Sequence, residues 1–209
     1  MRTHVATLDV PAFHIDVTPV TKSAYSAWLQ TSGWRPNTTQ NWLADWDWQQ
    51  RGQNASAPPR VRPGTEKQPV VWVSREDAKA YCAAKGARLP HSVEWQLAAQ
   101  GPERLAWPWG NTFDASKVPP LNSSRDMPPL ADVDAFPEAK SPYGLLDLVG
   151  NVYQWSDRFD DDHTAKAVLR GASAYKPEPM RWDAGCGCER HSFAPCPVTL
   201  LQKGVLSVC

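Results

Sequence analysis

Four side chains that bind soft or borderline metal ions stand close together near the C-terminal end of the sequence: Cys186, Cys188, His191 and Cys196. Tetrahedral zinc accepts three thiolates and one imidazole, and a short segment of this kind can fold around the metal. The spacing is not one of the usual zinc-knuckle patterns, however, and prolines flank the last cysteine on both sides. Free thiols in a divergent tail are therefore the favoured interpretation, and zinc stoichiometry measured on purified protein decides between the two.

A second polar group with potential metal ligands is the run Asp-Asp-Asp-His at residues 160–163. Consecutive carboxylates without a partner repel one another, and such a run is usually a solvated loop. We expect a surface loop at this position and no bound metal.

Three helices are expected to position these groups. The first begins at Thr21, a good N-cap residue, and runs to about Ser32. The second opens with the capping-box pattern S-x-x-D at Ser74 and ends at Gly86. The third covers about residues 91–100, where a glycine follows the last helical residue.

Strands are expected to be few and short. Residues 8–17 alternate apolar and polar side chains, residues 69–73 are a short apolar run, and residues 168–171 are typical of a short strand followed by a turn. Residues 143–155 carry glycines at irregular spacing, which favours a compact loop.

Residues 34–67 are rich in Asn, Gln, Pro and Gly but contain interspersed tryptophans, so we expect a long surface excursion held down by indoles. Loops of this length are uncommon unless they are functional, and this one is a candidate binding loop.

Composition and charge exclude several classes of protein. The chain has 209 residues, which fits one domain, and its 20 prolines and 11 tryptophans favour ordered loops over long regular elements. Lys+Arg and Asp+Glu are both 22, so the basic surface expected of a nucleic-acid-binding protein is lacking. No stretch approaches the roughly 18 apolar residues that cross a bilayer, so we expect no membrane span.

The five cysteines and the N-terminal residues bear on the compartment. An odd number of cysteines without a secretory signal argues against a disulfide framework. Polar residues and a proline interrupt any apolar run in the first 30 residues, so no secretory signal is recognised. The cytoplasm is the default expectation, and we expect a monomer.

Five segments, in order along the chain, together resemble the formylglycine-generating enzyme family, also called sulfatase-modifying factors: VPAFHIDVTPVTKSAYSAWL, PVVWVSREDAKAYCAAKGARLPHSVEWQLAAQG, WPWGN, SPYGLLDLVGNVYQW and LRGAS. One such segment is weak support, but five in register are specific. The resemblance implies an α+β, loop-rich, C-type-lectin-like fold with few short strands and about three helices. His91 stands where the family has a helix-capping threonine.

Both edges of the family domain depart from this sequence. The family's opening strand has no room before Met1, and its closing G-F-R-C strand is absent, so two edge strands of the core are expected to be missing. We therefore divide the chain into an incomplete family domain at 1–182 and a divergent Cys-rich tail at 183–209. One hypothesis is that the tail is out of frame; an intact, expressed transcript encoding it would contradict this hypothesis.

The resemblance also implies calcium at residues 147–154. In the family this loop surrounds a calcium ion, which implies ligands from the side chains of Asp147 and Gln154 and from the carbonyls of Gly150 and Val152. Calcium prefers six to eight hard oxygen ligands at about 2.3–2.6 Å, which a glycine-bearing loop can supply. The alternative is a tight turn in which Asp147 caps local amides. A second family calcium site implies Asn122 as a ligand.

Catalysis in the family depends on sulfur. Its enzymes oxidise a cysteine of a client protein, such as a sulfatase, to formylglycine with O2 and a copper(I) ion held by two thiolates, which are ligands that select Cu(I). Counting from the turn at residues 171–173, the two family cysteine positions fall on Arg181 and Cys186. One thiolate is therefore absent, because arginine cannot replace it, and Cys186 is the remaining candidate catalytic residue.

Three functions stay open at this point. The first is a formylglycine-generating oxidase, degenerate because it lacks one copper ligand. The second is a non-catalytic, calcium-stabilised module that binds a ligand or a protein on the same scaffold. The third is the related sulfoxide synthase of ergothioneine biosynthesis, which adds a helical iron-binding domain with histidine ligands. It is the least favoured, because the sequence has only five histidines and no H-x3-H-x-E-like cluster.

Overall fold

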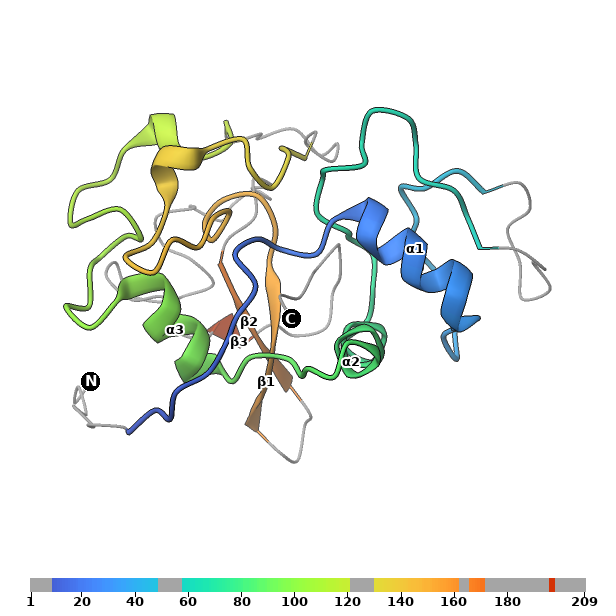
Figure 1. The fold of residues 1–209 in the computed structure, drawn as a ribbon, viewed down its shortest axis with the longest axis horizontal. Helices are drawn as coiled ribbons and strands as arrows, with labels where there is room; N and C mark the ends of the chain where they lie inside the picture. Colours follow the sequence, from blue (N-terminus) through green and yellow to red (C-terminus); the bar gives the residue numbers. More distant parts are fainter. Residues whose placement is uncertain (1–8, 49–57, 121–129, 162–165, 172–195, 198–209) are drawn as a thin grey trace.

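The computed structural model describes residues 9–48, 58–120, 130–161, 166–171 and 196–197. Regular structure within these ranges consists of three helices, two 3₁₀ turns and three strands (Figure 1). In chain order they are α1 (Lys22–Ser32), α2 (Arg75–Ala84), α3 (Ser92–Gln100), η1 (Ala115–Lys117), η2 (Pro137–Ala139), β1 (Gln154–Asp161), β2 (Lys166–Arg170) and β3 (Cys196–Pro197). This loop-rich α+β architecture confirms the fold class expected from the sequence.

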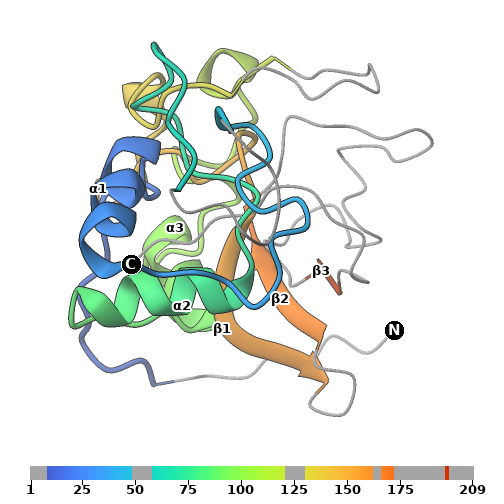
Figure 2. The same ribbon diagram turned by 90° about the vertical axis from the view of Figure 1, so that its right-hand side faces the viewer.

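The sheet is antiparallel with the strand order β1-β2-β3. β1 and β2 pair Gln154 with Arg170 and Trp155 with Leu169, and β3 adds to β2 through Cys196 opposite Leu169. α3 packs against β1 and β2. Figure 2 shows β1 and β2 side by side as one long hairpin, with α2 and α3 nearby. The sheet and α3 together support the loop that leads into β1.

The ends of the helices follow the residues that the sequence analysis identified. The Thr21 side chain accepts a hydrogen bond from the backbone N–H of Ala24, and Gly33 ends α1 in the left-handed conformation at φ 65°. At α2, Ser74 and Asp77 form the complete capping box. The three predicted helices are therefore confirmed to within one or two residues.

Aromatic side chains hold the long excursion against the helices. Trp42 and Trp46 are 4% and 1% exposed, and Trp46 meets Tyr25 of α1 edge-to-face with ring centroids 6.4 Å apart. Trp48 is half-buried and donates from Nε1 to the carbonyl of Leu43 at 2.9 Å. The expectation that indoles fasten this segment is confirmed for residues 39–48.

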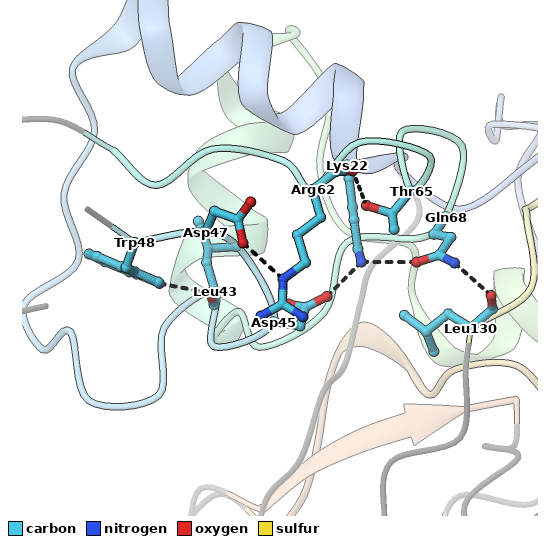
Figure 3. Close-up of polar contacts among 9 residues, drawn as sticks. All are labelled: Lys22, Leu43, Asp45, Asp47, Trp48, Arg62, Thr65, Gln68 and Leu130. Carbon is cyan, nitrogen blue, oxygen red and sulfur yellow. Dashed lines mark hydrogen bonds and ion pairs between the residues drawn. The ribbon is translucent and has the colours of Figure 1, made fainter. Parts of the chain in front are cut away.

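A buried ion pair fastens the same segment to the first turn of α1 (Figure 3). Lys22 is 3% exposed, and its Nζ lies 2.6 Å from Oδ2 of Asp45 and 3.0 Å from Oε1 of Gln68. The other carboxylate oxygen of Asp45 is buried and has no hydrogen-bond partner. The lysine therefore supplies the charge compensation that permits burial of this carboxylate.

Two predicted strands are wrong. Residues 9–17 and 69–73 form no strand, because each makes only isolated backbone contacts instead of a continuous ladder. The amide of Leu146 donates to the carbonyl of Val17 at 2.7 Å, and the amide of Val70 donates to the carbonyl of Val20 at 2.9 Å. In residues 9–17 the alternation reflects the partial burial of Phe13 and Ile15 against the core, without a neighbouring strand.

Two predicted loops are wrong in part. Gln154 and Trp155, assigned to a compact loop, begin β1, and Asp160 and Asp161, assigned to a solvated loop, end it. The pairing partner, β2, comes from the predicted strand near residue 168 and extends back to Lys166. Ladder pairing with β2 overrides the low strand propensity of the aspartates. Residues 162 and 163 lie outside the described residues.

Cys82, buried in α2, forms a disulfide. The sequence analysis did not expect it, because the odd number of cysteines argued against disulfides and the helical pattern assigned Cys82 only to the buried face.

The proposed domain boundary at residue 182 lies outside the described residues. No helix in the described part of the chain is long and apolar enough to cross a membrane.

Candidate metal centre

The loop of residues 147–154 lies between η2 and β1 and is tightly bent. Asp147 and Gly150 adopt positive φ values of 55° and 90°. Opposite the loop, Gly171 directly follows β2, and a Cβ at this position would lie 2.9 Å from the carbonyl oxygen of Leu148 and 3.2 Å from that of Val152. Only glycine allows the end of β2 to approach these carbonyls so closely.

Asp147 places a buried carboxylate inside this loop. It is 9% exposed, and its Oδ2 accepts a hydrogen bond from Nδ2 of Asn151 at 2.9 Å. None of the ion pairs found among the described residues involves Asp147. Desolvation raises the pKa of Asp147 to about 8, although the hydrogen bond from Asn151 opposes the rise. The site favours either a proton or a bound cation at this carboxylate.

Gln154 is completely buried and bridges two other groups of the site. Its Oε1 accepts a hydrogen bond from the indole Nε1 of Trp95 at 2.6 Å, and its Nε2 donates to the backbone carbonyl of Asp147 at 2.9 Å. Because an indole N–H can only donate, the amide oxygen must face Trp95 and the amide nitrogen must face the loop. Gln154 therefore ties the loop to α3.

Calcium fits part of this arrangement. The Asp147 carboxylate is a hard, buried oxygen donor, and Gly150 and Val152 lie in the same bend, whose backbone conformation is constrained by its glycine. Gln154 does not fit as a ligand in the observed orientation, since its oxygen is engaged by Trp95. Asn122, the candidate ligand of the second site, lies outside the described residues.

Asn151 is a site residue that the sequence analysis missed. It is 1% exposed, and besides its bond to Asp147 it pairs with the backbone of Ala131 in both directions, accepting at 3.1 Å and donating at 3.0 Å. The sequence signal was a polar residue between Gly150 and Val152 in an otherwise apolar stretch. A buried asparagine needs several partners, and the sequence alone did not reveal them.

The stability of the metal-free protein is expected to depend on the ionisation of Asp147. Its pKa is about 8 in the fold, against 3.8 as its ordinary value. Between these values the folded state binds the proton and the unfolded state has released it, so stability falls as pH rises, by at most about 1.4 kcal/mol per pH unit. Urea unfolding of the parent and of Asp147→Asn at pH 5, 6.5 and 8, with chelator, measures the effect. The asparagine variant should lose this pH dependence; equal slopes in both proteins would contradict the assignment.

The predicted copper and zinc ligands lie elsewhere in the chain. Arg181, Cys186, Cys188 and His191 are outside the described residues, as is the side chain of Cys196. Within the described ranges, no group of three or more His, Cys, Asp and Glu side chains is arranged to hold a metal. The copper and zinc hypotheses therefore remain predictions from the sequence.

A pocket of about 280 Å³, lined by both charged and apolar side chains, lies at the start of α3. Arg88 donates from both terminal nitrogens to the Glu94 carboxylate, at 2.8 and 2.6 Å, and the backbone N–H of His91 donates to the same carboxylate at 2.6 Å. The Arg88 fork holds the pKa of Glu94 below its ordinary value. Asp157 of β1 lines the pocket too and pairs with Arg75. Glu94 is thus a structural carboxylate that closes the start of the helix.

His91 itself occupies the N-cap position of α3 without making a side-chain cap. Replacing it by threonine is expected to stabilise the protein by about 0.5–2 kcal/mol, because a threonine hydroxyl at the N-cap accepts a hydrogen bond from a backbone N–H of the first turn better than an imidazole does. The thermal midpoint measures the gain, and His91→Ala is the matched control, since alanine removes the imidazole without adding an acceptor. Equal midpoints for the threonine and alanine variants would contradict the capping argument.

The chain, with its three helices, small sheet and glycine-bearing loop, matches a known protein family. The model of the sulfatase-modifying factor enzyme 1-like domain family matches residues 2–195. The chain belongs to this family. The match confirms the resemblance found in the sequence and covers the excursion at 34–67 as well.

Two relatives from the family illustrate its range. The inactive C-alpha-formylglycine-generating enzyme 2 of Bos taurus is 42% identical over 115 residues, covering 50% of this chain and 38% of the relative. The hercynine oxygenase of Mycolicibacterium thermoresistibile is 31% identical over 167 residues, covering 71% of this chain and 36% of the relative. The chain thus spans little more than a third of the length of either relative.

Solved structures share the fold. The structure of CarF has a TM-score of 0.60 at 17% identity and covers 93% of this chain and 84% of that chain. The structure of PvdO from Pseudomonas aeruginosa has a TM-score of 0.53 at 20% identity, and the match covers 77% of this chain and 67% of PvdO. At these identities the likeness shows the family fold alone.

Proposed function

We propose that this polypeptide is a non-catalytic, calcium-stabilised member of the sulfatase-modifying factor family that binds a ligand or another protein. The observation that carries the proposal is the loss of one copper ligand: Arg181 stands at the first of the two cysteine positions, and only Cys186 aligns with the second. Copper(I) held by two soft thiolates cannot be held in the same way by one. The relative from Bos taurus, whose name describes it as inactive, supports the same direction.

Calcium is proposed at the 147–154 loop. The Asp147 side chain and the carbonyls of Gly150 and Val152 would hold the ion, whose charge would offset the desolvation of the carboxylate. Support comes from the burial of Asp147, from its raised pKa, and from an environment in which only Asn151 hydrogen-bonds to the carboxylate among the described contacts. Gln154 would act through Asp147, whose backbone it holds, and Asn122 would serve a second ion.

A formylglycine-generating oxidase is the second candidate, because Cys186 is present and the resemblance to the family implies that activity. In this case Cys186 would be the catalytic thiol, copper(I) the cofactor, and a cysteine of a sulfatase-like client protein the substrate. The β-carbon of the client cysteine would be oxidised by two electrons to an aldehyde and its sulfur would leave as hydrogen sulfide. In the net reaction, O2 would supply the aldehyde oxygen and be reduced to one water, with the other two electrons coming from two external thiols that form a disulfide.

One assay distinguishes the two candidates. The protein is incubated under air with copper, a thiol reductant and a Cys-x-Pro-x-Arg peptide, and the mass of the peptide is followed. We expect no aldehyde product from the parent and none from Cys186→Ser, with circular dichroism confirming that both are folded. Aldehyde formed by the parent and lost in Cys186→Ser would overturn the non-catalytic proposal.

The hercynine oxygenase relationship gives the least favoured function. It shares the family domain, but this chain spans 36% of that relative and its five histidines form no H-x3-H-x-E-like cluster. Iron content of the purified protein tests it; a stoichiometric iron ion would support an oxygenase role.

A further inference from the structure

Gln68 joins two parts of the protein with the two ends of its side-chain amide. Its Oε1 accepts a hydrogen bond from Nζ of Lys22 at 3.0 Å, and its Nε2 donates to the backbone carbonyl of Leu130 at 2.8 Å (Figure 3). Its backbone carbonyl also accepts from the amide of Lys22 at 2.9 Å. The glutamine is thus anchored to α1 on one side and holds residue 130 on the other.

The residue after Leu130 carries this connection to the candidate metal centre. Ala131 pairs through its N–H and its carbonyl with the side-chain amide of Asn151. The amide of Val133 donates to the carbonyl of Lys67 at 3.1 Å, so the segment runs alongside residues 67 and 68. A fixed backbone at residues 130–131 therefore fixes both ends of the Asn151 amide.

Asn151 passes the connection to Asp147. One N–H of its Nδ2 donates to the Ala131 carbonyl, and the other N–H donates to Oδ2 of Asp147 at 2.9 Å. The orientation of Asn151 consequently sets the position of the carboxylate. The Asp147 backbone is held from the other side by Gln154.

We propose that Gln68 is a positioning residue for the metal-binding loop, acting through residues 130–131 and Asn151 on the Asp147 carboxylate. The proposal deepens the calcium site proposed above and rests on it for the identity of the ion, but the hydrogen-bond chain itself does not require metal. Gln68 lies 79 positions before Asp147 in the sequence and contacts none of the candidate ligands directly, so only the chain of contacts links them.

Amide hydrogen exchange of Ala131 tests the proposal without metal, because this N–H donates to Asn151. In Gln68→Met, we expect exchange of the Ala131 amide to accelerate about tenfold. Loss of the hydrogen bond from Gln68 to Leu130 should lower the free energy of local opening by about the net value of one hydrogen bond. Gln68→Glu keeps an acceptor for Lys22 and removes the donor to Leu130, so it should show a similar acceleration. If Gln68→Met does not fold, Gln68→Glu serves as the test variant in its place.

The matched control is Thr65→Val. Thr65 donates to the carbonyl of Arg62 at 2.8 Å within the same segment, so its loss perturbs the loop without touching residue 130. Exchange of the Ala131 amide in this variant should stay within about twofold of the parent. Unchanged exchange in folded Gln68→Glu, or equal acceleration in Thr65→Val, would overturn the positioning role.

Calcium titration of the same variants separates this proposal from the proposed function. If the parent binds calcium, Gln68→Glu should bind it about fivefold or more weakly, and Thr65→Val with parent affinity; equal affinity in Gln68→Glu and the parent would count against the positioning role. If the parent binds no calcium, the calcium site fails, whereas the exchange of Ala131 still decides whether Gln68 positions the loop.

Discussion

Replacing Lys22 by methionine is expected to destabilise the protein by about 3 kcal/mol, because it leaves the largely buried carboxylate of Asp45 without its counter-charge. The side chains of Lys22 and Asp45 are 4% and 21% exposed, and the second carboxylate oxygen of Asp45 has no partner that could compensate. The midpoint of urea unfolding at pH 7.5, followed by tryptophan fluorescence, measures the loss.

The double variant Lys22→Met/Asp45→Leu tests the cause. Because it removes both charges together, it should recover most of the lost stability. Lys67→Ala is the control: the Lys67–Asp134 pair also joins distant segments, but its side chains are 67% and 50% exposed, and the midpoint should barely change. A double variant as unstable as Lys22→Met alone would show that packing of the lysine stem, and not its charge, is what matters.

Gln154→Glu is expected to convert the 147–154 loop into a strongly calcium-dependent one. Without calcium, the variant loses the N–H donor to the Asp147 carbonyl and buries a second carboxylate close to the first, at a cost of at least about 2 kcal/mol. With calcium at about 100 times its dissociation constant, binding to the folded state should restore about 2.7 kcal/mol. Thermal midpoints with calcium and with chelator measure both effects.

Gln154→Met is the matched control for this substitution. Like Gln154→Glu it removes the hydrogen bond to the Asp147 carbonyl, and it also removes the one from Trp95, but it adds no charge. It should therefore be destabilised without gaining any response to calcium beyond that of the parent. A Gln154→Glu midpoint that is the same in calcium and in chelator would show that the loop does not hold calcium.

Local features of the fold could be predicted from the sequence. The three helices follow from capping residues and terminal glycines, such as Thr21 and Gly33, because these act within a few residues of the chain. The strand near residue 168 was found for a similar reason, from a short strand-and-turn pattern at residues 168–171. The predicted strands at 8–17 and 69–73 were wrong, since a strand requires a neighbour that no local pattern specifies.

The candidate metal loop was located by its resemblance to the family, but its hydrogen bonds were not. A sequence pattern places Asp147 and Gln154 seven residues apart; it does not show that the glutamine oxygen faces Trp95, 59 positions earlier. Asn151 was missed for the same reason, because its partner Ala131 is 20 positions away. Each of these contacts depends on packing between distant segments.

The sequence by itself determined the family, the helices and the balance of charge, because each is written in residue identity and short spacing. Only the tertiary structure decided that Lys22 is buried against Asp45, that Asp147 carries a raised pKa, and that Gln68 reaches the loop through residues 130–131. Burial and long-range hydrogen bonds arise when segments far apart in the chain pack together, and their energies depend on that environment.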